Sequence, residues 1–336
     1  MKVFRFQQLG IDQLLPTEAP MPVSQAHEVV LRVQALSLNA LDLLVIKGAI
    51  NPELPLPHIP ICDAAGTIAA VGSAVSTLAV GDEVTSVFIP RWREGEPTPA
   101  KTDNYYRPGL GQPGFLAEYV AVAADAVLRR PTYLSAVEAA TLPIAGLTAW
   151  NALKYGHPQP GETVLVHGTG GVSLFALQLA KARGCRVAIT SKDEGKLARA
   201  RELGADFTFN YATQPDWVEE LRTATGGLGA TAVLETVGGD NLRLSLQALA
   251  TRGRLVIMGL QKGTEAPLDV PMLMAKQANI IGMEVGSVAD FTALNQALET
   301  TQLHPVVDQV FAANEVQAAL RSLEAGSHFG KICLTF

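Results

Sequence analysis

The chain has 336 residues, of which 48% are hydrophobic and 17% charged, and its formal net charge is −6. This apolar content is enough for a sizeable core in one large domain or in two. Lysines and arginines are scattered, so the basic patch of a nucleic-acid-binding protein is missing, and no apolar run reaches the ~18 residues of a membrane-spanning helix. The three cysteines lie far apart in the sequence, which is typical of a reducing cytoplasm rather than of a disulfide framework. We therefore expect a cytoplasmic protein that binds neither nucleic acid nor membranes.

The chain up to about Val122 consists of short β-type runs separated by Gly, Pro and Asp. The clearest runs are Glu28–Ala35, Gly66–Val71 and Glu83–Ile89. Short strands with frequent turn signals predict a β-rich, barrel-like unit. The stretch 91–114 is rich in Pro and Gly and has no clear period, so we expect a long loop there.

From about Glu162 the pattern changes to alternating strands and helices. The predicted strands are Thr163–His167, Arg186–Thr190, Phe207–Asn210, Ala232–Val237 and Leu255–Gly259. The predicted helices are Ser173–Arg183, Glu194–Leu203, Asp216–Ala224 and Leu242–Ala250. Such alternation indicates a parallel sheet with helices on both faces. A helix near 288–299, a strand near 306–310, a helix near 315–324 and a closing strand at 331–336 are expected after it.

A glycine-rich turn follows the first of these strands. It reads Gly168-Thr169-Gly170-Gly171-Val172-Ser173 and leads into a helix. Glycines let the backbone approach a pyrophosphate closely, and the helix N-terminus offers free N–H groups and a positive dipole end. The usual dinucleotide fingerprint has a third glycine where Ser173 stands. Because the turn lies between a strand and a helix, and further strand–helix units follow, we predict a dinucleotide-binding site.

The end of the second strand indicates which dinucleotide is bound. A carboxylate at this place usually holds the ribose hydroxyls of NAD, whereas this chain has Ser191 and Lys192. A hydroxyl and a cation suit the 2′-phosphate of NADP(H), which a carboxylate would repel. Lys181, on the helix after the glycine-rich turn, is a further candidate for this pocket. We therefore predict NADP(H) as the cofactor.

Several motifs, in the right order along the chain, resemble those of the medium-chain dehydrogenase/reductase superfamily. They are Gly66–Gly72, Val80–Val84, Gly114–Val120, Ala140–Pro143, Gly146–Trp150, Gly168–Val172 and His328–Lys331. The resemblance covers essentially the whole chain. It implies an α/β protein with a GroES-like β-barrel catalytic domain, residues 1–122 and 286–336, and a Rossmann domain with a doubly wound parallel sheet, residues 123–285. A small-molecule substrate and a homo-oligomer, expected to be a dimer, are also implied.

The resemblance further implies roles for individual residues. Those implied to line the nicotinamide are Thr148, the loop Thr236–Gly239 with Thr236, Val237 and Gly238, and the loop Met258–Leu260 with Met258, Gly259 and Leu260. Lys331, in the C-terminal segment, is implied to approach the cofactor.

What the chain lacks relative to the zinc-dependent alcohol dehydrogenases of this superfamily is equally informative. Those enzymes place a Cys where Asn39 stands, a His-Glu pair where Cys62 and Asp63 stand, and a further ligand near Ile144. A catalytic zinc needs three protein ligands and an open position, which Asn39 and Ile144 do not supply. The four-cysteine lobe of a structural zinc is also missing, because 91–114 contains no cysteine. The motif Asn39-Ala40-Leu41-Asp42 resembles the quinone reductase branch, and we expect no metal.

These features favour a reductase over an alcohol-oxidising enzyme. Hydride transfer to a quinone, an enone or another conjugated carbonyl leaves negative charge on an oxygen, which hydrogen-bond donors must stabilise. The Asn39 amide, the Thr148 hydroxyl and the hydroxyls of the nicotinamide ribose are the candidate donors. Conjugation spreads the charge, so no metal is required, whereas alcohol oxidation without zinc needs another base.

Two alternatives remain open at this level. One is a zinc-independent alcohol dehydrogenase that uses Asp42 or a water chain as proton acceptor. The other is a non-catalytic NADPH-binding protein, because a fold does not fix a function.

Overall fold

The structure, a computed structural model, describes residues 1–336 and divides into two compact units. Residues 1–147 and 286–336 form the first, called the barrel unit below, and residues 148–285 form the second, called the dinucleotide unit. The barrel unit therefore extends past the boundary expected at residue 122. The cause is the segment after it, since strand β7 (Val127–Arg129) pairs with β5 and helix α2 (Ala136–Ala139) packs on β3 and β4.

The barrel unit is built mainly from strands. Its other strands are β1 (Lys2–Phe6), β2 (Leu14–Glu18), β3 (Glu28–Ser37), β4 (Asp63–Val71), β5 (Glu83–Ser86), β6 (Tyr119–Ala123), β14 (Val307–Ala312) and β15 (Lys331–Thr335). Its other helices are α1 (Ala40–Ile46), α9 (Val288–Thr301) and α10 (Val316–Ala325), with the short helices η1 (Ile11–Gln13), η2 (Asn104–Tyr106), η3 (Ala124–Ala126), η4 (Leu142–Gly146) and η5 (Ala313–Glu315).

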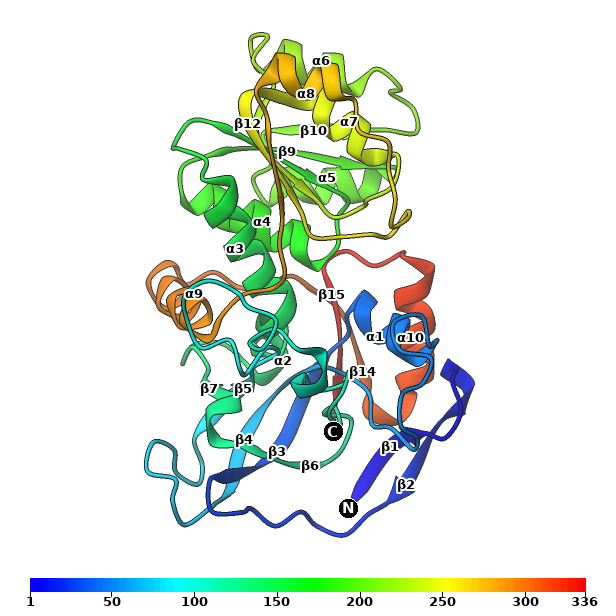
Figure 1. Cartoon of the computed structure of the whole chain (residues 1–336), viewed down its shortest axis with the longest axis vertical. Coiled ribbons are helices and arrows are strands. Elements are labelled where there is room, and N and C mark those ends of the chain that lie inside the picture. The colour runs from blue at the N-terminus through cyan, green and yellow to red at the C-terminus, as the bar shows by residue number, and fades with distance from the viewer. The chain divides into compact units, whose positions relative to one another are not determined.

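In this unit β1 and β2 form a two-stranded sheet, and a larger sheet pairs the C-terminal strand with a strand from the first part of the chain. Its strand order is β14-β15-β3-β4-β5-β7, with β6 also paired to β3. The C-terminal strand β15 lies antiparallel to β3, with Cys333 opposite Ser37. Figure 1 shows this pairing of the red C-terminal strand with the blue N-terminal part of the barrel unit. The pairing carries Lys331, at the start of β15, toward the end of β3.

The dinucleotide unit is the predicted parallel sheet with helices. Its strands are β8 (Thr163–His167), β9 (Arg186–Ser191), β10 (Phe207–Asn210), β11 (Ala230–Glu235), β12 (Leu249–Ile257) and β13 (Asn279–Gly282). Its helices are α3 (Leu147–Gly156, beginning at the last residue of the barrel unit), α4 (Gly171–Ala182), α5 (Glu194–Glu202), α6 (Trp217–Ala224), α7 (Asn241–Ala248) and α8 (Val270–Lys276).

The strand order of this sheet is β10-β9-β8-β11-β12-β13, all parallel. The chain therefore builds outward from β8 in one direction, then returns to build from β11 in the other. Right-handed crossovers place the helices of the two halves on opposite faces, which is the doubly wound Rossmann arrangement. In such sheets ligands bind at the carboxyl ends of the strands where the order reverses, and here that place is the end of β8 and of β11.

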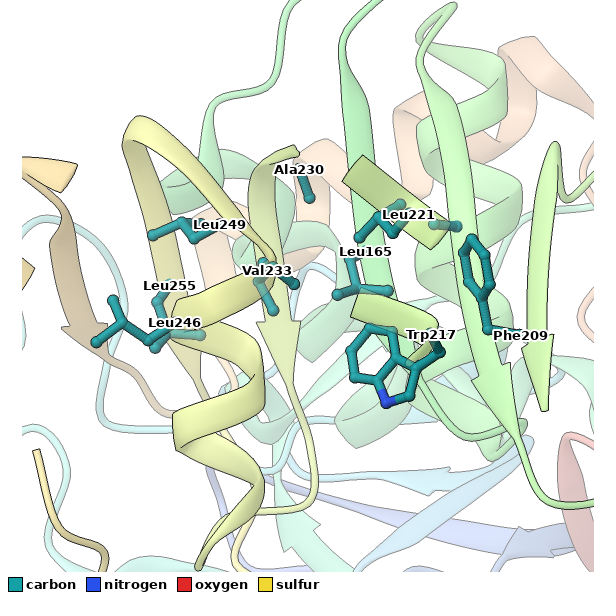
Figure 2. Packing of buried hydrophobic residues seen from close by; sticks show 11 residues of the cluster. Leu165, Phe209, Trp217, Leu221, Ala230, Val233, Leu246, Leu249 and Leu255 are labelled. Atoms are coloured by element: carbon teal, nitrogen blue, oxygen red, sulfur yellow. The ribbon is translucent and has the colours of Figure 1, made fainter. Parts of the chain in front are cut away.

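The face covered by α6 and α7 carries a continuous hydrophobic cluster. Trp217 from α6 and Leu246 from α7 pack with Leu165, Val233 and neighbouring buried residues of the sheet, as Figure 2 shows. Every second residue of each strand contributes to this face, because successive side chains of a strand point to opposite faces of the sheet. The cluster thus packs the central strands against α6 and α7. No helix is long and apolar enough to cross a membrane.

Candidate active site

The glycine-rich turn lies between β8 and α4, as the sequence predicts. Gly168 has φ +71°, and a Cβ built on Gly168 or Gly170 would meet no atom within 4 Å. The first N–H groups of α4 have no carbonyl before them within the helix. Ser173 donates its hydroxyl hydrogen to the carbonyl of His167 over 2.7 Å and so ties the helix to the strand. The open backbone cradle at a helix N-terminus fits the pyrophosphate of a dinucleotide.

Ser191 and Lys192 lie directly beside this turn. The N–H of Gly168 donates to the carbonyl of Thr190 over 2.8 Å, which places the end of β9 next to the turn. Ser191 is buried and Lys192 is exposed. Tyr211, which the sequence analysis did not consider, joins this strand end because its N–H donates to the carbonyl of Ser191 over 3.1 Å.

Lys181 lies away from the glycine-rich turn, in contrast to the place in the cofactor pocket that was expected for it. It stands in the last turn of α4, about ten residues or 15 Å along the helix from the glycine-rich turn. Its ammonium donates to both carboxylate oxygens of Asp206, over 3.0 and 2.8 Å. Asp206 precedes β10 and therefore lies at the amino edge of the sheet. The structure thus gives Lys181 a partner at the edge of the sheet opposite the glycine-rich turn.

The loops after β11 and β12 pack backbone against backbone. A Cβ on Gly259 would lie 2.0 Å from the carbonyl oxygen of Thr236, and one on Gly238 would lie 2.9 Å from Cα of Leu260. The N–H of Met258 donates to the carbonyl of Glu235 over 3.0 Å. The residues implied to line the nicotinamide in these two loops therefore form one connected edge of the dinucleotide unit.

A buried polar cluster in the barrel unit joins Asn39, Asp63 and Lys331. Asn39 Nδ2 donates to Asp63 Oδ2 over 2.8 Å and, with a longer contact of 3.4 Å, to the carbonyl of Ser37. Lys331 Nζ donates to Asn39 Oδ1 over 2.7 Å and to the carbonyl of Leu38. The exposed fractions of Asn39, Asp63 and Lys331 are 8%, 0% and 4%. The Asn39 amide therefore connects a buried cation to a buried carboxyl group.

This geometry bears on the role expected for Asn39. Both amide hydrogens have acceptors within the chain, one of them at a short distance. An ammonium has three hydrogens, and that of Lys331 uses two, on Leu38 and Asn39. Donation from Asn39 to a substrate stays a prediction, and Lys331 is the neighbouring group with a further hydrogen to donate.

The fold changes the ionisation of both Asp63 and Lys331 in this cluster. Burial raises the pKa of Asp63 to about 7, although the Lys331 ammonium and the Asn39 amide oppose the shift. Burial lowers the pKa of Lys331, and the charge of Asp63 opposes that change. Asp63 Oδ2 also accepts the N–H of Ile144 over 3.3 Å, whereas the buried Oδ1 has no partner. A carboxyl group that titrates near neutral pH can take up or release a proton during a reaction.

Asp42 has a structural position at the start of α1. Its Oδ2 accepts the N–H of Asn39 over 2.7 Å, and its Oδ1 accepts the N–H of Cys62 over 3.0 Å. Burial raises the pKa of Asp42, partly offset by these bonds. Both oxygens therefore hold backbone groups in place, and the proton-acceptor role considered for Asp42 stays a prediction.

Cys62 and Thr148 are both buried. Cys62 is fully buried, and burial together with the charges of Asp42 and Asp63 raises its thiol pKa well above the ordinary value. This is the environment of an inert cysteine. Thr148 lies buried in the first turn of α3, where its role toward a cofactor stays a prediction.

Comparisons with known proteins place this geometry in a family. The family described as "Alcohol dehydrogenase GroES-like domain" matches residues 25–132, and that described as "Zinc-binding dehydrogenase" matches residues 171–300. A zinc-type alcohol dehydrogenase-like protein of Schizosaccharomyces pombe is 38% identical over 97% of this chain and 96% of its own length. The chain belongs to the medium-chain dehydrogenase/reductase superfamily.

Other members of the superfamily differ in what they are named for. The quinone oxidoreductase of Homo sapiens is 28% identical over 97% of this chain and 95% of its own length. The crystal structure of an NAD-dependent alcohol dehydrogenase has a TM-score of 0.92 and 35% identity, covering all of both chains. This medium-chain dehydrogenase/reductase is therefore an oxidoreductase of a family that binds a nicotinamide cofactor, and its glycine-rich turn has the open cradle that such a cofactor needs.

The residues present do not fit the zinc that one family description names. No group of three or more His, Cys, Asp or Glu side chains could hold a metal ion. The oxygen of Asn39, which the resemblance implies to stand at the place of one ligand of the zinc enzymes, accepts a hydrogen bond from the Lys331 ammonium. A buried positive charge at that point would repel a metal cation.

Proposed function

We propose that this protein is an NADPH-dependent reductase that transfers hydride to a quinone, an enone or another conjugated carbonyl without zinc. The observation that carries the proposal is the buried Lys331 ammonium, bonded to Asn39 where the zinc enzymes have a metal ligand. An ammonium can stabilise the negative charge that develops on a carbonyl oxygen, as a metal would. The donor set around it does not suit zinc, for the reasons given above.

In the proposed reaction each residue has a defined task. The reduced nicotinamide, when bound, supplies the hydride. The glycine-rich turn and the loops after β11 and β12 orient the dinucleotide, while the remaining hydrogen of Lys331 is available to the substrate oxygen. Asn39 positions Lys331 by accepting its second hydrogen bond. Asp63, with a pKa of about 7 and a buried oxygen without a partner, is a group that can hold the proton the product requires.

The choice of NADPH rests on the end of β9. Ser191 and Lys192 stand where a carboxylate would select NAD. A 2′-phosphate there would gain charge-assisted hydrogen bonds. The first carboxylate after Ser191 in the sequence is Asp193, whose Oδ1 caps α5 through the N–H of Lys196.

The second candidate is a zinc-independent alcohol dehydrogenase. The names of several relatives and the raised pKa of Asp63 favour it, because a carboxylate near neutral pH could accept the alcohol proton. A non-catalytic NADPH-binding role is the third. Such a protein would use the same turn, but this role assigns no function to the cluster of Lys331, Asn39 and Asp63.

We also propose that the protein is a cytoplasmic homodimer that binds neither nucleic acid nor membranes. Strand β13 ends the sheet of the dinucleotide unit and is paired on one side alone. Ile280 on this strand is 37% exposed, and Met274 on the preceding helix is 72% exposed. A free sheet edge beside exposed apolar side chains is a surface on which a second copy can add its own strand.

An acceptor screen tests the proposed reaction. NADPH oxidation is measured with quinones, enones, nitroalkenes and aldehydes, and NADP⁺ reduction with simple alcohols. Consumption of NADPH with a quinone or enone supports the proposal. Turnover of simple alcohols alone would make the alcohol dehydrogenase the better account, and binding of NADPH without any turnover would favour the third role.

A further inference from the structure

Four buried polar side chains form a chain of hydrogen bonds beneath the carboxyl edge of the dinucleotide unit. They are Thr190 at the end of β9, His167 at the end of β8, Ser245 in α7 and Glu235 at the end of β11. Their exposed fractions lie between 0% and 3%. None of them belongs to the glycine-rich turn or to the loops assigned above to the cofactor.

The distances define one continuous path between the strand ends. His167 Nδ1 lies 3.1 Å from Thr190 Oγ1, and His167 Nε2 lies 2.8 Å from Ser245 Oγ. Ser245 Oγ donates to Glu235 Oε2 over 2.5 Å. A serine hydroxyl has one hydrogen, so Ser245 must accept from His167 Nε2–H. Burial lowers the pKa of His167, and in its neutral form Nδ1 then accepts the hydroxyl hydrogen of Thr190.

Glu235 anchors the other end of this path to the loop after β11. Its Oε1 accepts the N–H groups of Val237 and Gly238, over 2.6 and 3.0 Å. Its Oε2 accepts Asn241 Nδ2 over 2.8 Å in addition to Ser245. Burial raises the pKa of Glu235, but the hydrogen bonds from Ser245, Val237 and Gly238 oppose burial, and the pKa lies below its ordinary value. The side chain is thus a buried carboxylate with four donors, and it fixes the conformation of the loop.

The carbonyl of His167 joins the same loops a second time. It accepts the hydroxyl of Ser173, the third residue of α4, over 2.7 Å. It also accepts the hydroxyl of Thr236 over 3.0 Å. The turn that holds the pyrophosphate and the loop implied to face the nicotinamide are therefore connected through one histidine and the groups bonded to it.

We propose that Glu235, Ser245 and His167 are positioning residues that hold the Gly168–Val172 turn and the Thr236–Gly239 loop at a fixed separation, and so set the affinity for the intact dinucleotide. The proposal rests on the proposed function in assigning the two loops to the two ends of the cofactor. Ordering flexible loops on binding costs affinity, and loops that are already ordered avoid that cost. A ligand that spans both loops gains from their fixed separation, whereas a fragment that touches one loop does not.

The test compares the whole cofactor with a fragment. Ser245→Ala removes the group that links His167 to Glu235 and leaves the loop sequences unchanged. The dissociation constants of NADPH and of 2′,5′-ADP, which lacks the nicotinamide half, are measured by calorimetry on the full chain. We expect the Kd of NADPH to rise about tenfold, in line with the net worth of a hydrogen bond to a charged group. The Kd of 2′,5′-ADP should change by less than about twofold.

Two further variants separate positioning from general stability. Thr190→Val removes the last hydroxyl of the path with almost no change of shape, and should weaken NADPH by about threefold, whereas Thr190→Ser should not. The matched control is Thr225→Val. Thr225 is a buried hydroxyl of the same unit that bonds the N–H of Gly229, before the amino end of β11. This control should lower the melting temperature but leave both dissociation constants unchanged.

The outcomes are distinct. A selective loss of NADPH affinity in Ser245→Ala and Thr190→Val supports the network. An unchanged NADPH Kd, or an equal weakening of NADPH and 2′,5′-ADP, overturns it. If the wild-type protein prefers NADH, the cofactor assigned in the proposed function fails. The same selective loss measured with NADH against ADP would then still support the network.

Discussion

Asp63 illustrates how a fold changes the chemistry of a single side chain. Its ordinary pKa is 3.8, and burial beside Asn39 and Ile144 raises it to about 7. The folded state therefore favours the protonated form. Below pH ~4 the carboxyl group is protonated in both states. Between pH ~4 and ~7 the folded state binds a proton that the unfolded state has released, so stability falls as the pH rises.

The first prediction follows from this loss of stability with rising pH. Between pH 4 and pH 7 the free energy of unfolding of the wild-type protein should fall by about 4 kcal/mol more than that of the Asp63→Asn variant. At higher pH the difference between the two proteins should stay constant. Urea unfolding of both proteins at several pH values measures the difference. A difference that does not depend on pH would show that the pKa of Asp63 is not raised.

Asn39 is the subject of the second prediction. Asn39→Ala removes the acceptor of Lys331 and a donor of Asp63, and should lower the free energy of unfolding by about 1–3 kcal/mol. It should also lower kcat for enone or quinone reduction by about tenfold, less than the loss of a direct oxyanion donor. The Kd of NADPH should remain nearly unchanged, because Asn39 lies in the barrel unit.

The control for Asn39 is Asn295→Ala. Asn295 donates to the carbonyl of Arg129 in the same unit, over 3.1 Å, away from the buried cluster. This variant should be less stable but keep its normal kcat per folded molecule. A normal kcat in Asn39→Ala as well would reduce Asn39 to a structural role.

At this scale the sequence could predict Asn39 and Lys331 but not their connection. Asn39 stands in a motif and Lys331 in the family's C-terminal ending, so a resemblance is enough to find both. Their hydrogen bond depends on β15 pairing with β3, which no local pattern reveals. The same holds for Asp63, whose orphaned oxygen and raised pKa follow from burial among groups distant in the sequence.

At the scale of elements, we propose that the end of β9 sets the preference for one dinucleotide over the other. The third prediction is that Ser191→Asp combined with Lys192→Ala reverses the preference for NADPH over NADH. Two charge-assisted hydrogen bonds to the 2′-phosphate are lost and a repelling charge is added. Because Lys192 is exposed and water screens its charge, the ratio of the two dissociation constants should change by about tenfold to a hundredfold. Fluorescence titration with both cofactors measures this ratio.

Lys181→Ala is the matched control for this pair. It removes a lysine of the same unit whose ammonium binds Asp206 at the other edge of the sheet. The ratio should remain as in the wild-type protein. Equal affinity of the unmodified protein for NADPH and NADH would contradict the assignment of this pocket.

The strands and helices after Glu162 were the most predictable part of the fold. Hydrophobic runs of the right length and glycines at the helix ends locate β8, α4, β9 and α5 to within about two residues. Helix α1 and the segment from α2 to α3 are less regular in sequence, and no local pattern predicts helices there. The position of Lys181 was mispredicted for a related reason. The sequence places Lys181 on α4, but it does not show which edge of the sheet the end of this helix reaches.

At the scale of the whole molecule, the open edge of β13 underlies the fourth prediction. Sedimentation should give a mass near twice the 35.6 kDa of one chain. Ile280→Lys, which places a charge on this edge, should shift the equilibrium toward the monomer at micromolar concentration. Val310→Lys tests another exposed apolar residue, 52% exposed on the outer strand β14 of the barrel unit, and should leave the mass unchanged. A monomeric wild-type protein would contradict the proposed dimer.

We propose that hydride transfer to a conjugated carbonyl proceeds in this protein with a buried ammonium and without a metal. The most direct measurement is NADPH oxidation with an enone or quinone by protein dialysed against a strong chelator, with the zinc content of the same sample determined by elemental analysis. We predict that the rate is unchanged when the zinc content is far below one atom per chain. Loss of the activity on chelation, with its return on adding Zn²⁺, would contradict the claim.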